Sequence, residues 1–214
     1  MPVNMVSHAH GQGYSDLHFI IPETVDMVDF GKGPYYADRG NFGTAGYVAF
    51  KTKDNLENSL FSMEAGRFNT VRSAALLNLV KNDHHNLYLA SEYHITDGPF
   101  ESSQDFSRRN IMLKYTGKYE NNSILSVIAS NFYSKWDASG QIPERLVNDG
   151  TISRFGAVDD TEGGVTGRSN IAIDFTQPID NNTFIKSNIF YSRYDFELYS
   201  NFTFFFKYPL IGDQ

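Results

Sequence analysis

Residues 86–96 read NLYLASEYHIT, and the polarity of their side chains alternates with a period of two. In an extended strand, successive side chains point to opposite sides. One row is Leu87, Leu89, Tyr93 and Ile95, and the other is Tyr88, Glu92, His94 and Thr96. A strand with two such rows is stable only where its two sides meet different surroundings, so this stretch predicts a β-strand at a boundary between two media.

The same alternation recurs on both sides of this stretch. Ile111, Leu113, Tyr115 and Tyr119 alternate with Asn110, Lys114, Thr116 and Lys118, and Ile171, Ile173 and Phe175 alternate with Asn170, Asp174 and Thr176. Tight turns at Asn121-Asn122 and Asp180-Asn181-Asn182 separate such stretches. The pattern predicts about seven or eight antiparallel strands, near residues 58–68, 70–80, 86–97, 106–120, 123–136, 167–177, 183–196 and 197–207.

The predicted connections are of two kinds. Those at Asn69, at 120–122 and at 178–182 are short, whereas residues 137–166 form a long, polar, glycine-rich stretch. Short turns at one end and long loops at the other are typical of outer-membrane barrels. The pattern fits only in part, because the lengths of the earlier connections do not alternate cleanly.

Composition narrows the class of protein further. The 214 residues are 15% aromatic, contain no cysteine and carry a formal charge of −7. The basic residues form no stripe, which argues against nucleic acid as a partner. No window of about 18 apolar residues exists, so a transmembrane helix is excluded, whereas a mean hydropathy of −0.38 is compatible with membrane-spanning strands.

Residues 1–53 differ from the rest because they are loop-rich and contain only short apolar runs. A short helix is predicted from Pro22 to Asp29, since proline suits the first helical position and Glu23 lies at the positive end of the helix dipole. Gly31 and Gly33 would end this helix. Residues 47–52 read YVAFKT, whose β-branched and aromatic content predicts a strand.

Aromatic residues gather where strands are expected to end. They are Phe132, Tyr133 and Trp136, then Tyr191, Tyr194, Phe196 and Tyr199, and finally Phe202, Phe204, Phe205, Phe206 and Tyr208. Such groups are typical of the aromatic belts at membrane–water interfaces. The alternative is the buried aromatic core of a soluble β-sandwich.

Several segments resemble the TonB-dependent outer-membrane receptors. Residues 28–34 read VDFGKGP, similar to V-E-V-x-R-G-P near the end of that family's plug domain, and residues 45–53 read AGYVAFKTK, similar to G-G-x-I-N-I-x-T-K. Arg39-Gly40-Asn41 stands where the family usually has Tyr-Gly and a small polar residue. Residues 136–145 and 155–164 resemble an extracellular loop of one subgroup. Arg39, Ala45 and Ala49 depart from the family pattern.

The resemblance implies an all-β fold: an incomplete portion of a large antiparallel transmembrane β-barrel, with the end of an N-terminal plug domain. Residues 1–54 would be the plug remnant and residues 55–214 the first seven or eight barrel strands. A complete receptor has roughly 22 strands, and an open edge in lipid leaves backbone groups unpaired at several kcal/mol each. We therefore expect residues 1–214 to be a fragment of a longer receptor.

The function implied by the resemblance is energy-coupled uptake of a siderophore, metal complex, cobalamin or glycan across the outer membrane. The expected partners are outer-membrane lipid, a small-molecule nutrient, and the TonB complex, which would bind through a preceding part of the receptor. No cofactor is expected. Two alternatives stay open: a soluble all-β binding module, and a small self-contained outer-membrane barrel.

The N-terminal region contains a cluster of candidate ligand-binding residues. His8, His10, Gln12, Tyr14 and Asp16 would contact substrate if their loop lies at the apex of the plug. Neutral imidazoles bind borderline metals, and neighbouring glycines allow close residues to converge, so His8 and His10 are also candidate metal ligands. A polar loop whose histidines bond to the barrel wall is the simpler alternative.

Charged residues supply a second set of candidates. Glu23 and Arg39 would pair with charges of the barrel wall and hold the plug in place. Ionised groups belong on the water-filled side of a barrel wall. The lumen-facing candidates are Glu64, Arg67, Arg72, Glu92, His94, Arg108, Lys114 and Lys118.

The long loop carries Arg145, Arg154, Asp159, Asp160 and Glu162, which could gate the protein or bind ligand, although such loops are usually only solvated. The three acidic residues could bind calcium weakly, but they lack the EF-hand spacing. No phosphate-binding glycine loop, G-x-S-x-G or H-E-x-x-H motif occurs, so we do not expect an enzyme.

Overall fold

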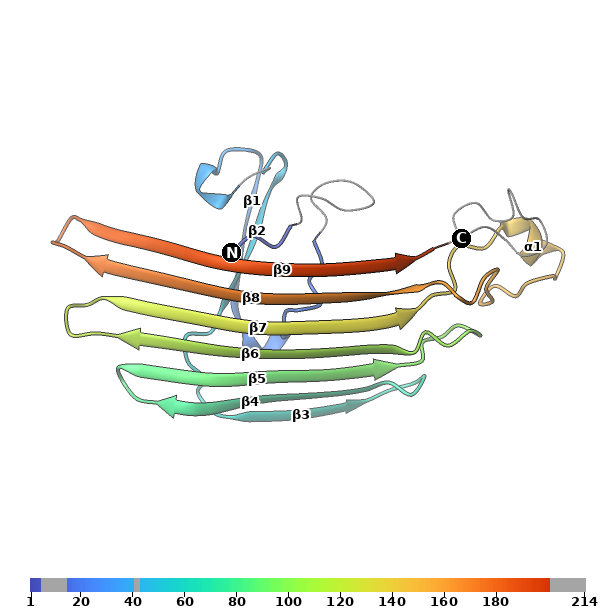
Figure 1. Ribbon diagram of the computed structural model, residues 1–214, viewed down its shortest axis with the longest axis horizontal. Helices are drawn as coiled ribbons and strands as arrows, with labels where there is room; N and C mark the ends of the chain where they lie inside the picture. The colour runs from blue at the N-terminus through green and yellow to red at the C-terminus, as the bar shows by residue number, and fades with distance from the viewer. Residues whose placement is uncertain (5–14, 41–42, 201–214) are drawn as a thin grey trace.

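The computed structural model describes residues 1–4, 15–40 and 43–200. These residues form an almost all-β structure with two antiparallel sheets (Figure 1). A hairpin of β1 (Val25–Lys32) and β2 (Gly46–Thr52) makes the small sheet. The large sheet contains β3 (Leu60–Ala65), β4 (Val71–Lys81), β5 (His85–Thr96), β6 (Phe106–Lys118), β7 (Ile124–Asp137), β8 (Gly163–Pro178) and β9 (Phe184–Tyr199).

The large sheet is a simple meander, because each strand pairs with its sequence neighbour in the order β3-β4-β5-β6-β7-β8-β9. This confirms the predicted all-β fold and seven of the predicted strands. The eighth, at 197–207, is not a separate strand in its first residues, since β9 continues to Tyr199. The part of that prediction beyond residue 200 lies outside the described residues.

All long connections of the large sheet lie at one end (Figure 1). Residues 97–105 and 138–162 cross that end, and the second of these loops carries the short helix α1 (Glu144–Asn148). Residues 82–84, 119–123 and 179–183 form short turns at the opposite end. The turn at Asn69 joins β3 to β4 at the long-loop end, which is why the lengths read along the sequence do not alternate cleanly.

The predicted helix from Pro22 to Asp29 is wrong beyond its first turn. Proline does open a helical turn, but this turn is a 3-10 helix, η1 (Pro22–Thr24), and β1 begins at Val25. The backbone of β1 pairs with β2 from Val25↔Thr52 to Lys32↔Gly46. Tertiary pairing of this β-branched and aromatic segment therefore outweighs the helix-start signals. The predicted strand at 47–52 is confirmed as β2.

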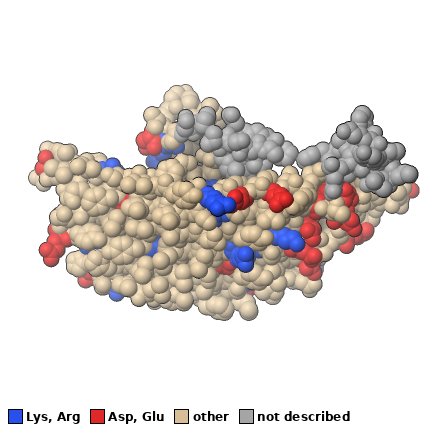
Figure 2. All heavy atoms as spheres, viewed as in Figure 1, with Lys and Arg blue, Asp and Glu red and all other residues tan. Residues whose placement is uncertain are grey.

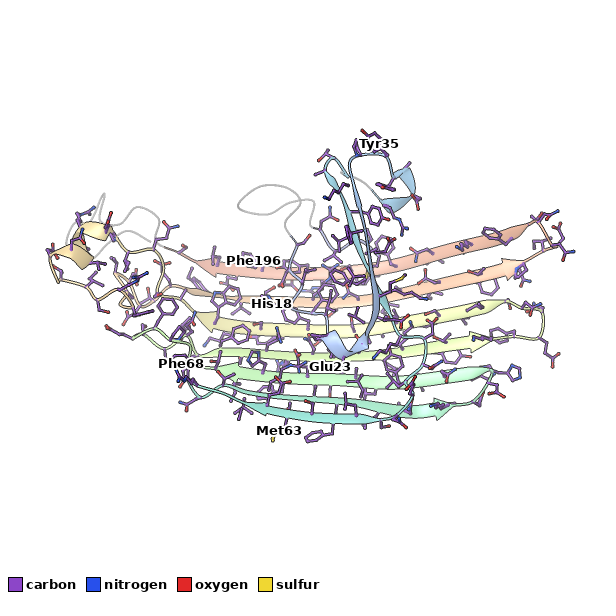
Figure 3. All side chains as sticks on the ribbon, turned by 180° about the vertical axis from the view of Figure 1, so that it is seen from behind. His18, Glu23, Tyr35, Met63, Phe68 and Phe196 are labelled. Atoms are coloured by element: carbon purple, nitrogen blue, oxygen red, sulfur yellow. The ribbon has the colours of Figure 1, made fainter. Side chains whose placement is uncertain are left out.

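The two faces of the large sheet have opposite chemistry. The inner face lies on the side of residues 1–4, 15–40 and 43–59, hereafter the N-terminal segment (Figure 3). Part of this segment packs on the inner face, while the tip of the β1–β2 hairpin, at Tyr35, projects away from it. The inner face carries Tyr88, Glu92, Asn110, Thr166 and Arg168, all buried. The polar row is thus buried by the N-terminal segment rather than exposed.

The outer face carries the apolar row, which is open to the surroundings. Side chains exposed there include Phe61, Met63, Leu77, Tyr93, Ile111, Leu113, Ile171, Ile189 and Tyr191. Ile111 and Ile171 are 48% and 50% exposed, although each lies in the middle of its strand. Figure 2 shows this face as a broad uncharged surface, with charges gathered mainly towards the long-loop end. In the described residues, no helix is long and apolar enough to cross a membrane.

The aromatic residues at strand ends divide between the two faces. Trp136, Tyr194 and Phe196 share the register positions of inner-face residues, and their rings lie near one another, with centroids 6.3 Å apart for both the Trp136–Phe196 and Tyr194–Phe196 pairs. Tyr133 and Tyr199 point outward by the same register and lie near strand ends, whereas Tyr191 points outward opposite Ile171 in the middle of its strand. Only Tyr133 and Tyr199 suit an interfacial belt, and the residues from Phe202 to Tyr208 lie outside the described range.

A small hydrophobic core lies between the N-terminal segment and the sheet. Ile21 and Leu56 pack against Leu76, Tyr88 and Ala90 of the inner face. Each of these side chains is nearly inaccessible to solvent. The N-terminal segment is therefore anchored by apolar burial as well as by polar contacts.

We predict that Gly46→Ala destabilises the β1–β2 hairpin. Gly46 has φ +145°, and a Cβ atom there would lie 2.2 Å from the carbonyl oxygen of Gly31. Strain of this kind costs about 1–3 kcal/mol, so tryptic cleavage within the hairpin should accelerate roughly fivefold or more. Gly43→Ala is the control, because its Cβ would meet nothing closer than 3.9 Å. Equal cleavage rates in the two variants would contradict the prediction.

Candidate functional site

The candidate site is the polar interface between the N-terminal segment and the inner face. Its centre is Arg72 of β4, whose side chain is only 13% exposed. Nη1 and Nη2 donate to Oε1 and Oε2 of Glu23, each over 2.8 Å. Nη1 also donates to Glu64 and Nε donates to Glu92, again over 2.8 Å. One arginine thus binds carboxylates from β3, from β5 and from the N-terminal segment.

Glu92 is the buried counterpart of Arg72. Its side chain is fully inaccessible, and its carboxylate also lies 2.9 Å from Nε of Arg108 on β6. Asn110 donates from Nδ2 to Glu92 over 3.1 Å and to the backbone carbonyl of His18 over 2.9 Å. A buried charge is tolerated only when it is paired and hydrogen-bonded. Glu92 meets that condition through partners on two strands, Arg72 on β4 and Arg108 and Asn110 on β6.

Cross-strand register explains why these residues meet. Glu64 is opposite Arg72, Arg72 is opposite His94, and His94 is opposite Arg108. Residues directly opposite each other in antiparallel strands have neighbouring side chains on the same face. Five of the predicted lumen-facing residues, Glu64, Arg72, Glu92, His94 and Arg108, therefore form one cluster. Arg67 lies in the turn after β3, and Lys114 and Lys118 lie further along β6.

A second contact joins the end of β2 to β5 and β6. Lys114 is buried, and its Nζ donates to the carbonyl and hydroxyl oxygens of Thr52, both over 3.0 Å, and to Asp54 over 2.9 Å. The hydroxyl of Tyr88 donates to the carbonyl of Lys53 over 3.0 Å. The chain is thus attached to the inner face just before it enters β3.

A third contact lies on β8. Arg168 is buried and donates to the carbonyls of Pro2 and Val3 over 2.9 and 3.0 Å. Its guanidinium lies 4.7 Å from the ring centroid of Phe19. Arg168 was not among the residues predicted from the sequence, although its position in the polar row of Asn170 and Asp174 was a signal that could have identified it.

Two carboxyl groups of the N-terminal segment have lowered pKa values. The hydrogen bonds from Arg72 are the main cause at Glu23 and outweigh the opposing effect of burial on its pKa. At Asp16, burial alone would raise the pKa, but hydrogen bonds from the side chain and backbone of His18 together reverse the direction. Both groups are therefore held in their charged form by the folded structure.

The structure places the residues that the sequence singled out as follows. Glu23 contacts the sheet through Arg72, and Asp16 is buried, with Thr166 donating to it over 3.5 Å. Arg39 does not pair with the sheet in the described contacts: it binds Asp29 within the β1–β2 hairpin over 3.0 Å and lies over the ring of Tyr47. His8, His10, Gln12 and Tyr14 lie outside the described residues.

The described contacts of the long-loop candidates lie within the loop and at its base. Arg145 lies in α1, and Asp159 accepts hydrogen bonds from the backbone and hydroxyl of Thr161 within the same loop. Glu162 is buried at the base of the loop. Within the described part of the chain, no group of three or more acidic or histidine residues could hold a metal ion.

Comparison with known proteins gives one structural likeness. No family model matches the chain, and no curated protein matches it closely enough to count as a relative. Among solved structures it is similar to the open form of the ferric-catecholate import receptor Fiu from E. coli K12, with a TM-score of 0.61 and 16% sequence identity. The match covers 82% of this chain but only 29% of the receptor. It shows, as a distant structural match, a fold like that of TonB-dependent receptors.

We predict that Glu23→Gln weakens the attachment of the N-terminal segment. Hydrogen bonds between charged groups contribute about 1.5–3 kcal/mol, and the amide keeps the shape while losing the charge. A spin label at Leu17→Cys, an exposed position in a chain without cysteine, reports release of the segment as urea rises. The urea midpoint should fall in Glu23→Gln and stay unchanged in Asp26→Asn, which alters an exposed carboxylate of the same segment.

The same label should show that acid releases the segment. A carboxyl group with a lowered pKa stabilises the folded state above its ordinary pKa, which is 4.5 for Glu23, and loses that contribution as the pH falls through the lowered value. At pH values below 4.5, the urea midpoint should therefore decrease as the pH falls. This decrease should be less steep in Glu23→Gln. A pH profile identical in both proteins would mean that Glu23 is not a group that controls release.

Proposed function

We propose that this chain forms part of an outer-membrane receptor of the TonB-dependent kind, which imports a scarce nutrient. Residues 1–54 are the end of its plug and residues 55–214 are strands of its barrel wall. The observation that carries the proposal is that one sheet has an apolar outer face and a charged inner face that binds the N-terminal segment. Lipid on the outer side explains the apolar face, and a plugged, hydrated lumen on the inner side explains the charged face.

The outer face argues against a soluble binding module. A soluble sheet directs its apolar row into a core, and large exposed apolar patches mark interaction sites. Here Ile111, Ile171 and Ile189 point outward, and the row that is buried is the polar one. Contact with acyl chains removes this area from water.

The sheet edges argue against a small closed barrel. In the described residues, β3 and β9 lie at opposite edges of the large sheet and do not pair with each other. A membrane-spanning sheet needs partners for the backbone groups of both edge strands. We therefore propose that further strands complete the wall in the assembled receptor.

The structural similarity suggests a class of cargo rather than a specific molecule. The structurally similar Fiu is a ferric-catecholate import receptor, so an iron–siderophore complex is our first candidate, ahead of other metal complexes, cobalamin or glycans. We propose that His8, His10, Gln12 and Tyr14 contact this cargo, whereas Asp16, buried beside Thr166 of β8, helps to hold the segment on the wall. His8 and His10 are the candidates for a direct bond to its metal.

In the proposed cycle, the TonB complex pulls on a preceding part of the plug. The contacts that must yield are those between the segment and the wall: Glu23 to Arg72, residues 52–54 to Lys114, and residues 2–3 to Arg168. These contacts are polar and directional, so they can be exchanged for contacts with water that enters the lumen. The wall, held by backbone pairing, stays closed to lipid while the plug moves.

A cleavable bismaleimide joining Thr52→Cys to Lys114→Cys tests this proposal in the full receptor. Nζ of Lys114 lies 3.0 Å from the hydroxyl of Thr52, so the two positions are close enough to span. We predict that the linked receptor binds an iron–siderophore but does not import it, and that cleavage of the linker restores import. Each single-cysteine variant, treated in the same way, is the control.

Variants of the histidine cluster should behave in the opposite way. We expect His8→Ala/His10→Ala to lower affinity for the cargo in the same cells, whereas the linker blocks import with affinity unchanged. Continued import by the linked receptor would contradict the proposed function. Unchanged affinity in the double variant would remove only the two histidines from the site.

A further inference from the structure

A groove of about 1050 Å³ lies at the short-turn end of the large sheet, away from the interface with the N-terminal segment. The turns at 82–84 and 119–123 form its rim, and Leu125 and Phe175 contribute apolar surface. These two residues are directly opposite each other on β7 and β8, in the outward-pointing row that contains Ile171 and Ile173. The groove therefore joins the apolar outer face to the polar edge of the sheet.

The rim is held in a defined shape by local hydrogen bonds. Oδ1 of Asn82 accepts bonds from the backbone N–H groups of His84 and His85, and the N–H of Lys118 donates to the carbonyl of His84 over 2.7 Å. His85 also stacks on Tyr115, with centroids 6.0 Å apart, and lies edge-on to Tyr119 at 5.8 Å. The two turns thus present their side chains from a fixed backbone.

The groove combines three kinds of chemistry within one site. Lys118 is the last residue of the inner row of β6 and lines the groove where that row meets the turn, so it and His84 offer hydrogen-bond donors for an anion. Asp83 and Glu120 offer carboxylates for a cation. Leu125 and Phe175 offer a surface for a hydrocarbon chain. An occupant that matches all three has an anionic group, a cationic group that donates hydrogen bonds, and an apolar tail.

We propose that this groove binds one phospholipid with a phosphoethanolamine headgroup. The phosphate lies near Lys118 and His84, the primary ammonium lies near Asp83 and Glu120, and an acyl chain covers Leu125 and Phe175. This inference rests on the proposed function, because only a bilayer around the outer face brings lipid to the groove.

Other common headgroups match the groove less well. A phosphoglycerol headgroup carries a phosphate but no cation, so it leaves Asp83 and Glu120 facing an anion without compensation. A phosphocholine headgroup carries a quaternary ammonium, which has no N–H group to donate to a carboxylate. A preference for phosphoethanolamine over the other two headgroups would therefore show that Asp83 and Glu120 contribute to binding.

Native mass spectrometry of the full-length protein in nanodiscs tests the proposal. The nanodiscs contain equal amounts of phosphatidylethanolamine, phosphatidylglycerol and phosphatidylcholine with identical acyl chains. We expect the lipid retained by the wild type to be enriched in phosphatidylethanolamine by about fivefold, the scale of an exposed ion pair. Asp83→Asn/Glu120→Gln should abolish this enrichment.

A matched control alters the same kinds of group at another place on the outer face. Arg193 and Asp195 form an exposed ion pair on β9, with Nε and Oδ2 3.0 Å apart. Arg193→Gln/Asp195→Asn should keep the enrichment, because these residues do not line the groove. A change in fold is checked by the import assay, in which both double variants should match the wild type.

The outcomes separate this inference from the function on which it rests. Retention of all three lipids in equal amounts, or equal enrichment in wild type and Asp83→Asn/Glu120→Gln, overturns the headgroup site while the membrane location stands. Failure of the protein to enter nanodiscs or to retain any lipid overturns the membrane location, and the headgroup site with it.

Discussion

The structure depends on one constraint: neighbouring side chains of a β-strand must point to opposite faces. Seven strands obey it in register, so a single sheet carries an apolar outer face and a polar inner face. A charge placed one residue out of phase would face the apolar side. Ile111 and Asn110 are adjacent in sequence, yet one is 48% exposed and the other is buried against the N-terminal segment. Both placements are stable only if the outer surroundings are apolar and the inner partner is polar.

The N-terminal segment completes the inner face both electrostatically and by packing. Without Glu23, the guanidinium of Arg72 would still pair with Glu64 and Glu92, but it would lose the ion pair that joins it to the N-terminal segment. Ile21 and Leu56 exclude water beside this cluster, and a less hydrated surrounding strengthens each ion pair. The resulting interface is well packed, but it consists largely of polar bonds that can be replaced by bonds to water. That combination suits the proposed plug role, in which the segment keeps its place at rest and moves when it is pulled.

The strands of the large sheet and the faces of their side chains were largely predictable from the sequence, because strand periodicity is a local property. The alternation in residues 86–96 and 110–119 located β5 and β6 and the faces of their side chains. The helix expected from Pro22 to Asp29 failed because pairing with β2, a long-range event, decided the conformation of β1. The partner of Glu23 could not be known either, since the docking of the segment on β4 is not encoded in any spacing. Arg168 was overlooked, although it lies in the same alternating polar row as Asn170 and Asp174.

Oxygen accessibility of single spin labels along β6, in a bilayer, tests the central claim most directly. The cysteine-free chain permits one label at a time at positions 110–116. If the apolar row faces lipid, positions 111, 113 and 115 should show high accessibility to dissolved oxygen and low accessibility to a water-soluble nickel complex. Positions 110, 112, 114 and 116 should show low oxygen accessibility. Equal values at all positions, or high nickel accessibility at 111 and 113, would show that the apolar row does not face lipid.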